Sequence, residues 1–276
     1  MTTLGFGVAR AQPLMAARFS ELCLLATRSC GVTIAPTPTA TYGELARALV
    51  ERQLAIAWLP PIAALELSER GAVEVLALPL RSGAMAYHTA LVAKSGAAKD
   101  LSRYRGGRVA WVDPHSASGY VMPRVHLASL GVDPRAFFGQ ELFAQTHLGV
   151  VDAVASGRAD LGATYCSCEG PARRVVRGAW TSPEGAPIRP VEAIVTAGPI
   201  PNDAIVVTPD VGVLERASLM RFLMTPTPDA RALLSDTFNT TEFRVAKPNH
   251  FAQLREMVRT ARSLGYGSIV PAPFRD

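Results

Sequence analysis

The chain lacks the features that would place it in a membrane or on a nucleic acid. Its 276 residues contain no apolar run of about eighteen, the length that predicts a membrane-spanning helix. Lysine occurs only as Lys94, Lys99 and Lys247, and the arginines that dominate the net charge of +5 are scattered. A nucleic-acid-binding surface would show a basic stripe with interleaved aromatic residues. We therefore expect no membrane span and no nucleic-acid partner.

The N-terminus also lacks the basic stretch, apolar core and small-residue cleavage site of a secretory signal. The first predicted strand, residues 4–8, follows almost at once. As it stands, the sequence predicts a cytoplasmic protein. A periplasmic location would require that a signal peptide has been trimmed from this chain.

Cysteine is scarce, with four residues in the chain. Cys23 and Cys30 lie on a predicted helix, roughly 10 Å apart along its axis, which is too far for a direct disulfide. Cys166 and Cys168 alternate on or just after a strand, and no second pair completes a zinc site. We expect buried free thiols, no metal, and no requirement for an oxidising compartment.

What the sequence does have is a regular alternation of strands and helices. Nearly continuous apolar strands favour parallel sheets covered by helices on both faces, a doubly wound α/β architecture. The tetrapeptide Thr41-Tyr42-Gly43-Glu44 has the pattern of a capping box and predicts a helix that continues to Arg52. Further predicted helices cover 13–30, a stretch after 118, and 148–156, and predicted strands cover 32–35, 54–59, 73–80, 87–94, 108–113, 141–144 and 159–165.

The last third is organised differently. A segment rich in Gly, Pro and Arg, residues 168–190, predicts a loose connection. Strands are predicted at 191–196 and 204–207, and helices at 212–224, 229–238 and 249–264. No internal repeat or low-complexity tract is evident.

The stretch DPHSASGYVMP, residues 113–123, joins a buried-type strand to a helix. The first N–H groups of that helix have no internal partners and lie at the positive end of its dipole, which favours an anion. Ser116 and Ser118 add hydroxyl donors, and Gly119 permits close approach of an oxyanion. The alternative is that one serine simply caps the helix. Pro123 predicts that the first turn is irregular or that the helix begins later.

The order of several motifs resembles the phosphate, phosphite and phosphonate-binding proteins of ABC importers. They are Y-x-x-L after the second strand, DP-x-S-x-SG-Y-x-x-P, F…TH…V-x-A-V-x-SG-x-AD-x-GA, and IPND, and the similarity extends over about residues 5–265. The resemblance implies a type II periplasmic-binding-protein fold: two doubly wound α/β lobes joined by two crossover strands, which close on a small anion. It places residues 1–85 and 197–276 in lobe 1 and residues 86–196 in lobe 2.

The resemblance also implies ligand-binding residues in the second lobe. The family's serine-threonine-serine-glycine turn matches Ser116, Ala117, Ser118 and Gly119, so the middle hydroxyl is missing here. The family's histidine matches His147, which would donate a hydrogen bond to a phosphoryl-type oxygen. A surface or helix-capping histidine is the alternative.

Three further positions match residues that line the family's ligand site. Tyr42 would offer its hydroxyl from the first lobe, although a lone tyrosine usually packs as an amphipathic residue. Tyr87, at the start of the first crossover strand, either lines the ligand site or packs in the hinge. Asp203 is either a partner for a ligand proton or ammonium, or it only begins the strand 204–207. Family members that bind aminophosphonates carry a further acidic residue after the strand that matches residues 159–165. Here only Glu169 could replace it, so the resemblance favours phosphite, phosphate or methylphosphonate over an aminophosphonate.

The function that the resemblance implies is capture of a small phosphorus oxyanion for an ABC importer. We expect a monomer that needs no cofactor, and its partner is the permease if the chain is exported. One alternative is a cytosolic enzyme on the same fold, similar to chorismate dehydratase, with Asp203, His147 or Asp113 as general base. Another is a ligand sensor for a signalling partner. The sequence shows no nucleophile elbow, metal cluster or phosphate P-loop, so we expect no enzymatic activity and no catalytic residue.

Overall fold

The computed structural model describes residues 3–9, 13–81, 83–114, 116–170, 174–247 and 249–265. Within them the chain forms two compact units. The first unit takes in the chain up to Met85 and again from Pro201 to Phe251. The second takes in Ala86–Ile200 and begins again at Ala252. Each unit is built around its own sheet.

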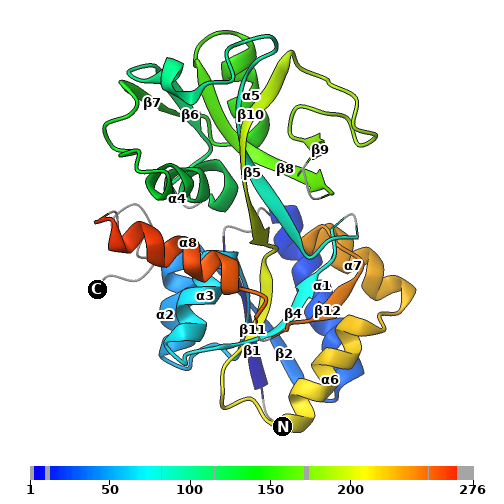
Figure 1. Ribbon diagram of the computed structural model, residues 1–276. Coiled ribbons are helices and arrows are strands. Elements are labelled where there is room, and N and C mark those ends of the chain that lie inside the picture. The colour runs from blue at the N-terminus through cyan, green and yellow to red at the C-terminus, as the bar shows by residue number, and fades with distance from the viewer. Residues whose placement is uncertain are drawn as a thin grey trace. The chain divides into compact units, whose positions relative to one another are not determined.

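The first unit is a mixed sheet with helices on both faces (Figure 1). In spatial order its strands are β12 (Phe243–Val245), β4 (Glu74–Pro79), β11 (Ala204–Val207), β3 (Ile56–Leu59), β1 (Thr3–Ala9) and β2 (Thr33–Thr39). Parallel pairing joins β1 to β2 and β3, and antiparallel pairing joins β11 to β3 and β4, and β12 to β4. Its helices are α1 (Pro13–Cys30), α2 (Tyr42–Val50), α3 (Pro61–Glu69), α6 (Val213–Met224) and α7 (Pro228–Phe238).

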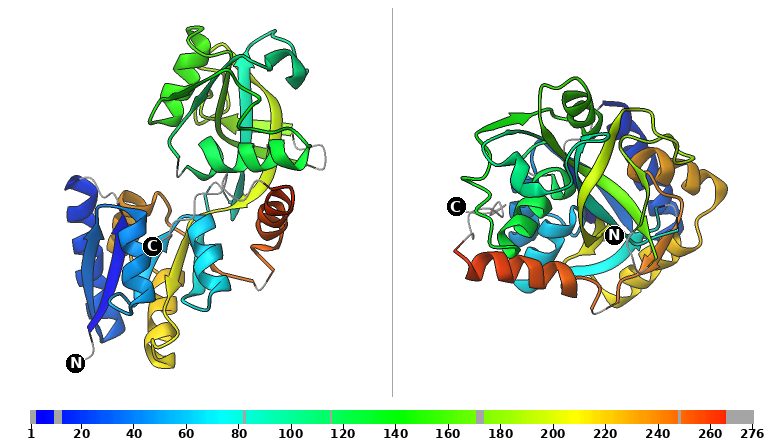
Figure 2. Two further views of the ribbon diagram at one scale, coloured as in Figure 1. Left: turned by 90° about the vertical axis from the view of Figure 1, so that its left-hand side faces the viewer. Right: turned by 45° about the horizontal axis from the view of Figure 1, so that its top comes forward.

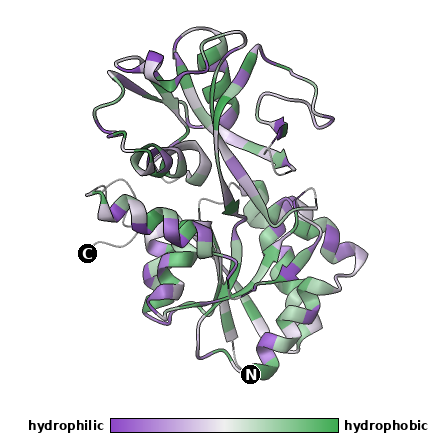
Figure 3. Ribbon diagram, in the orientation of Figure 1, coloured by the Kyte–Doolittle hydropathy of each residue, from purple (hydrophilic) through white to green (hydrophobic). Residues whose placement is uncertain are grey.

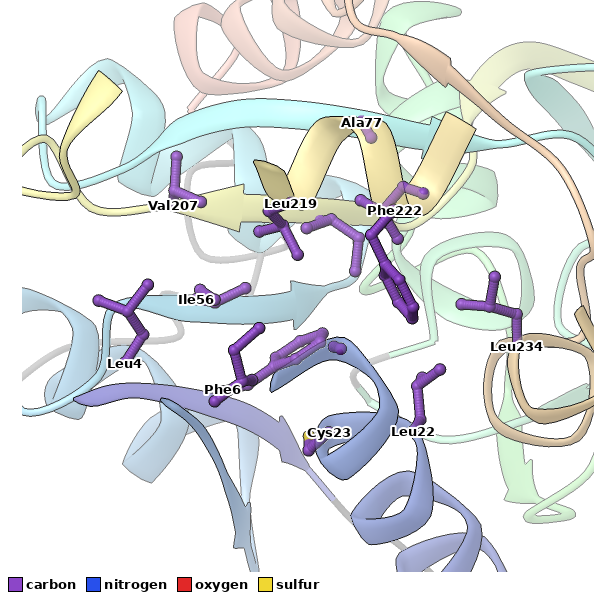
Figure 4. Packing of buried hydrophobic residues seen from close by; sticks show 14 of the residues in the cluster. Leu4, Phe6, Leu22, Cys23, Ile56, Ala77, Val207, Leu219, Phe222 and Leu234 are labelled. Carbon is purple, nitrogen blue, oxygen red and sulfur yellow. The ribbon is translucent and has the colours of Figure 1, made fainter. Parts of the chain in front are cut away.

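The core of the first unit follows from strand alternation. Leu4, Phe6 and Val8 of β1 point to one face, where the ring of Phe6 meets Phe19 of α1 edge to face at 5.0 Å. Figure 4 shows this cluster, in which side chains from β1, β3, β4 and β11 meet those of α1, α6 and α7. On the other face Gly7 leaves no room for a Cβ atom against Leu45 of α2. The sheet therefore carries helices tightly on both sides.

The second unit has a second mixed sheet. In spatial order the strands are β10 (Val191–Pro201), β5 (Ala86–Lys94), β8 (Leu161–Glu169), β6 (Arg108–Trp111) and β7 (Gln140–Phe143), with β9 (Arg174–Gly178) on β8. Strand β6 pairs in parallel with β7 and β8, and β8 pairs antiparallel with β5 and β9. Its helices are a π-helical turn η2 (Ala117–Val121), α4 (Met122–Ser129), α5 (His147–Ala155), α8 (Ala252–Ser263) and the short 3-10 turn η1 (Leu101–Tyr104).

Two clusters of apolar side chains cover the second sheet. One contains Val150, Val151 and Val154 of α5, and the other contains Trp111 of β6 with Phe137 and Phe138. Figure 3 shows green, hydrophobic residues along much of the strands and a mixture of hydrophilic and hydrophobic residues along α8. No helix within the described ranges is long and apolar enough to cross a membrane.

Besides the short turn η1, three elements of the structure were not expected from the sequence. Helix α3 begins at two prolines, which suit a first helical turn, and its residues 61–67 are all buried, so it has no polar face to reveal a helical period. Strand β9 lies within the segment predicted to be loose, and β12 has three residues. Short or uniformly buried elements carry too little periodicity to be predicted.

Helix α8 differs from the expectation in its location. The sequence placed all of residues 197–276 in the first lobe, whereas α8 contacts α4 and is grouped with the second unit. Figures 1 and 2 show the two helices side by side. The buried face of α8 is formed by Leu254, Val258 and Ala261. An amphipathic pattern predicts that a face is buried but not which element covers it.

Candidate anion-binding site

The turn after β6 is built around an irregular helix start. Ser116 caps it: its Oγ accepts a hydrogen bond from the backbone N–H of Gly119 at 3.1 Å. Residues 117–121 form a π-helical turn before α4, whose first turn accommodates Pro123. The predicted irregularity is therefore confirmed, and the capping role proposed as the alternative for one serine applies to Ser116.

Packing against the end of β6 requires a glycine at position 119. A Cβ atom at this position would collide with the side chain of Val112 and lie 2.8 Å from Ser116 Oγ. The backbone N–H of Val112 also donates to the carbonyl oxygen of Gly119 at 3.1 Å. The end of β6 and the start of the helix thus touch through the glycine.

Ser118 is held from a neighbouring strand. The residue is 3% exposed, and its carbonyl oxygen accepts a hydrogen bond from Thr89 Oγ1 of β5 at 2.7 Å. Ala117, the position where the family has a hydroxyl, is also buried. Thr89 was not identified from the sequence, because only the sheet brings β5 to this turn.

His147 is the first residue of α5 and lies partly buried. The N-cap of this helix is Thr146, whose Oγ1 accepts from the N–H of Gly149 at 2.9 Å. The Nδ1 atom of His147 lies 3.0 Å from Oγ1 of Thr164 on β8, and its ring packs edge to face on Tyr165 with 4.9 Å between centroids. Thr164 and Tyr165 were not predicted as site residues, since they belong to a strand rather than to a motif.

The electrostatics of His147 favour an uncharged ring. Burial lowers the pKa of His147 to about 4, and the nearby Asp113 opposes this shift more weakly. Because Thr164 occupies Nδ1, the nitrogen that remains for a ligand is Nε2. A Thr164 hydroxyl that donates to Nδ1 leaves the proton on Nε2, which makes that atom a neutral donor.

These groups lie at the carboxyl edge of parallel strands. The turn of residues 113–119 follows β6, and Thr146 and His147 follow β7, whose continuation is joined to β6 by the hydrogen bond from Ala144 N to Trp111 O at 2.8 Å. Gln145, just before them, has a φ of 65°, a left-handed conformation that is uncommon for a side chain of this type. Two helix starts, each at the positive end of a helix dipole, and the imidazole of His147 form a set of groups suited to an anion.

The remaining predicted residues belong to β5 and to the first unit. Tyr87 belongs to β5 in the second unit and is half-buried. Tyr42 is the first residue of α2 in the first unit. There the predicted capping box is confirmed, because Thr41 Oγ1 accepts from Glu44 N at 3.1 Å and Glu44 Oε2 accepts from Ala40 N at 3.0 Å.

Asp203 also belongs to the first unit, where it forms an ion pair. Its Oδ2 lies 2.8 Å from Arg81 Nη2, and the Arg81 guanidinium also stacks over Trp58 at 5.8 Å. The preceding Asn202 is buried and donates to the carbonyl oxygens of Pro79 and Ala84. Arg81 lies more than one hundred residues before Asp203, and no local pattern links the two in the sequence.

Comparison with known proteins agrees with this fold. The structure superimposes on XAC2383 from Xanthomonas citri, solved bound to ATP, with a TM-score of 0.75 at 19% identity, covering 96% of this chain and 98% of that one. A binding protein component of an ABC phosphonate transporter from Pseudomonas aeruginosa gives a TM-score of 0.68 at 21% identity, covering 98% and 94%. PhnD1 from Prochlorococcus marinus, solved with methylphosphonate, gives 0.66 at 17% identity, covering 96% and 98%. No curated protein matches the sequence.

The predicted type II periplasmic-binding-protein architecture is confirmed by these neighbours and by the two mixed sheets. Residues 8–251 match the family model described as ABC transporter, phosphonate, periplasmic substrate-binding protein. That is a family of transport proteins and not of enzymes, so the dehydratase alternative is not supported. The chain belongs to the family of periplasmic substrate-binding proteins of phosphonate ABC transporters.

Proposed function

We propose that the chain binds phosphite, phosphate or an alkylphosphonate in the periplasm and delivers it to the permease of an ABC importer. The observation that carries this proposal is that Thr164 contacts His147 Nδ1 at the start of α5, while Thr89 bonds both Thr164 and Ser118 of the capped turn. The boundaries of the two lobes, near residues 85 and 197, stay part of the proposal.

A set of neutral donors suits an ionised phosphorus oxyanion. Each hydrogen bond to a charged oxygen contributes about 1.5–3 kcal/mol, and no permanent cation is needed. The missing hydroxyl at Ala117 removes one donor relative to the family's turn. The ion pair of Asp203 with Arg81 gives that carboxylate a cationic partner, which makes a role as acceptor for a ligand ammonium less favourable.

Titration calorimetry with methylphosphonate, phosphite, phosphate and ATP tests the proposal, with sulfate as a comparison anion. ATP is included because its phosphates present the same oxyanion chemistry and XAC2383 was solved with it. We expect one of the compact phosphorus anions to bind. Binding of ATP alone would assign a nucleotide ligand instead, and no binding at all would refute the proposal.

Variants identify the residues that hold the ligand. We expect Ser118→Ala and His147→Ala to weaken binding at least tenfold, which corresponds to about 1.4 kcal/mol. Ser129→Ala is a matched control, because Ser129 is the last residue of α4, exposed and bonded to the carbonyl oxygen of His126. An equal effect of all three substitutions would show that the turn is not the site.

A further inference from the structure

Two cysteines on β8 are in contact with each other and have no part in the proposed anion site. Cys166 is fully buried and Cys168 is partly buried, and both pack in the cluster that contains Trp180 and the valines of α5. Their Sγ atoms lie 3.7 Å apart. In the structure all four cysteines of the chain are free thiols.

The backbone geometry allows these sulfur atoms to bond. Residues two apart on a strand have Cα atoms separated by about 6.6 Å, inside the range of roughly 4.4–6.8 Å found for disulfides. Their side chains point to the same face. The pairing of β8 with β9 is interrupted between Ser167 and Cys168, where Val176 is the extra residue on β9. Such a bulge loosens the ladder beside the pair and gives β8 room to adjust.

The other two cysteines do not share this arrangement. Cys23 and Cys30 lie almost two turns apart on α1, one buried in the first core and one partly buried. They serve as internal controls in the same chain.

We propose that Cys166 and Cys168 form a reversible intrachain disulfide. The oxidant is a disulfide of low molecular weight, such as glutathione disulfide, or the disulfide of a thiol oxidoreductase. The family is periplasmic, and the periplasm is a compartment in which disulfides persist.

The reaction has two exchange steps. The Cys168 thiolate, the more accessible of the two, attacks one sulfur of the oxidant; a mixed disulfide forms and one oxidant thiolate leaves. The Cys166 thiolate then attacks Sγ of Cys168, and the second oxidant thiolate leaves. The two cysteine protons end on the departing thiolates, so the protein loses two electrons and the oxidant gains them. Burial raises the pKa of Cys166, so only a small fraction is thiolate near neutral pH. Because the thiolate is the nucleophile, the second step becomes faster as pH rises.

The disulfide would act on the anion site through β8. Thr164, two residues before Cys166, positions His147, and Tyr165 packs on its ring. Drawing the two sulfur atoms from 3.7 Å to about 2.05 Å changes the local path of this strand. This consequence rests on the proposed function, whereas formation of the disulfide does not.

Peptide mass measurement on the unmodified chain tests disulfide formation. The protein is equilibrated in glutathione buffers of increasing disulfide fraction, alkylated and digested with trypsin, which yields one peptide, residues 159–173, with both cysteines. We expect this peptide to lose both alkyl groups and become two hydrogen atoms lighter than its unalkylated dithiol form, and dithiothreitol to reverse the change. Peptides 19–28 and 29–47, which carry Cys23 and Cys30 singly, should remain alkylated.

Other results would overturn the proposal. Two alkylated thiols at every buffer ratio, or a stable glutathione adduct on Cys168 without ring closure, would show that no disulfide forms. Because the readout uses the native chain, failure of a variant to fold cannot obscure it.

A second measurement tests the effect on the site. We expect the affinity for methylphosphonate, phosphite or phosphate to differ at least threefold between the oxidised and reduced protein, and Cys168→Ser to remove that difference. Cys30→Ser is the matched control and should keep it. Equal affinities with the disulfide formed would refute the link to His147. Absence of binding in the reduced protein would instead refute the proposed function and leave the peptide result standing.

Discussion

At the scale of single residues, burial of His147 changes its protonation in the acidic pH range. Its folded pKa of about 4 lies below the value of about 6.5 for an unfolded histidine, because burial disfavours the charged ring. The unfolded chain therefore binds a proton at a higher pH than the folded chain. Stability from the neutral ring is fully present above about pH 6.5 and is lost as pH falls toward 4.

This difference predicts a pH-dependent stability. The free energy of unfolding should fall by up to about 3 kcal/mol more in the wild type than in His147→Gln when the pH is lowered from 7.5 to 4, because glutamine does not titrate. Urea denaturation of both proteins at several pH values measures this. An equal loss in the two proteins would contradict a buried neutral His147.

The contact between Thr164 and His147 predicts that substitution of Thr164 weakens ligand binding. In Thr164→Val the Nδ1 atom of His147 loses its partner, and the proton is no longer directed to Nε2. We expect binding of the phosphorus anion to weaken about threefold to tenfold, which is roughly 0.7–1.4 kcal/mol. Nitrogen NMR of the ring should show a shift toward the other tautomer.

Thr164→Ser is the control for this experiment, since it keeps the hydroxyl. It should retain near wild-type affinity and the wild-type tautomer. Equal losses in the serine and valine variants would point to packing rather than to the hydrogen bond.

The turn between a strand and a helix was enough to predict Ser116, Ser118 and Gly119 from local sequence, and the family resemblance added His147. Neither predicted Thr89, Thr164 or Arg81. Their hydrogen-bond partners lie 29, 17 and 122 positions away in the sequence, and no local pattern predicts such pairs. Their roles follow only once the sheets are assembled.

At the scale of elements, the π-helical turn depends on a glycine. In Gly119→Ala the new methyl group meets Val112 and Ser116, and the turn must shift to accommodate it. We expect a loss of about 1–3 kcal/mol in unfolding free energy and at least threefold weaker ligand binding. Denaturation and calorimetry on the same variant measure the two effects.

Gly131, just after α4, provides the contrast. It has a φ of 75° and open space where a Cβ would lie, so Gly131→Ala costs about 1–2 kcal/mol through backbone strain. Ligand binding should be unchanged. Weaker binding in both variants would mean that general destabilisation, rather than the shape of the turn, controls affinity.

Elements with a clear period or cap were predicted from sequence, as the capping box of α2 and the apolar strands show. Helix α3 was missed because burial on all sides removes the contrast between faces, and β9 because glycine, proline and arginine obscure a short strand. The location of α8 was not predictable, because its buried stripe fits any apolar surface. The tertiary contact between α8 and α4 determines where α8 lies.

At the scale of the whole molecule, the two units have separate cores. The cluster around Phe6 and Phe19 lies in the first unit, and those around Trp111 and Val150 lie in the second. Separate cores can unfold in separate steps, and a ligand stabilises only the folded structure that it contacts. Calorimetric unfolding with and without ligand therefore reports which unit holds it.

We expect the bound phosphorus anion to raise the unfolding temperature of both units, since Tyr42 belongs to the first and His147 to the second and we propose that both contact it. At a ligand concentration one hundred times Kd the stabilisation is about 2.7 kcal/mol. Tyr42→Phe, which removes only the hydroxyl, should reduce the shift of the first unit, while His147→Ala should reduce both, because it removes most of the affinity. A shift confined to the second unit would show that Tyr42 and Asp203 do not contact the ligand and that the anion is held by the turn and α5 alone.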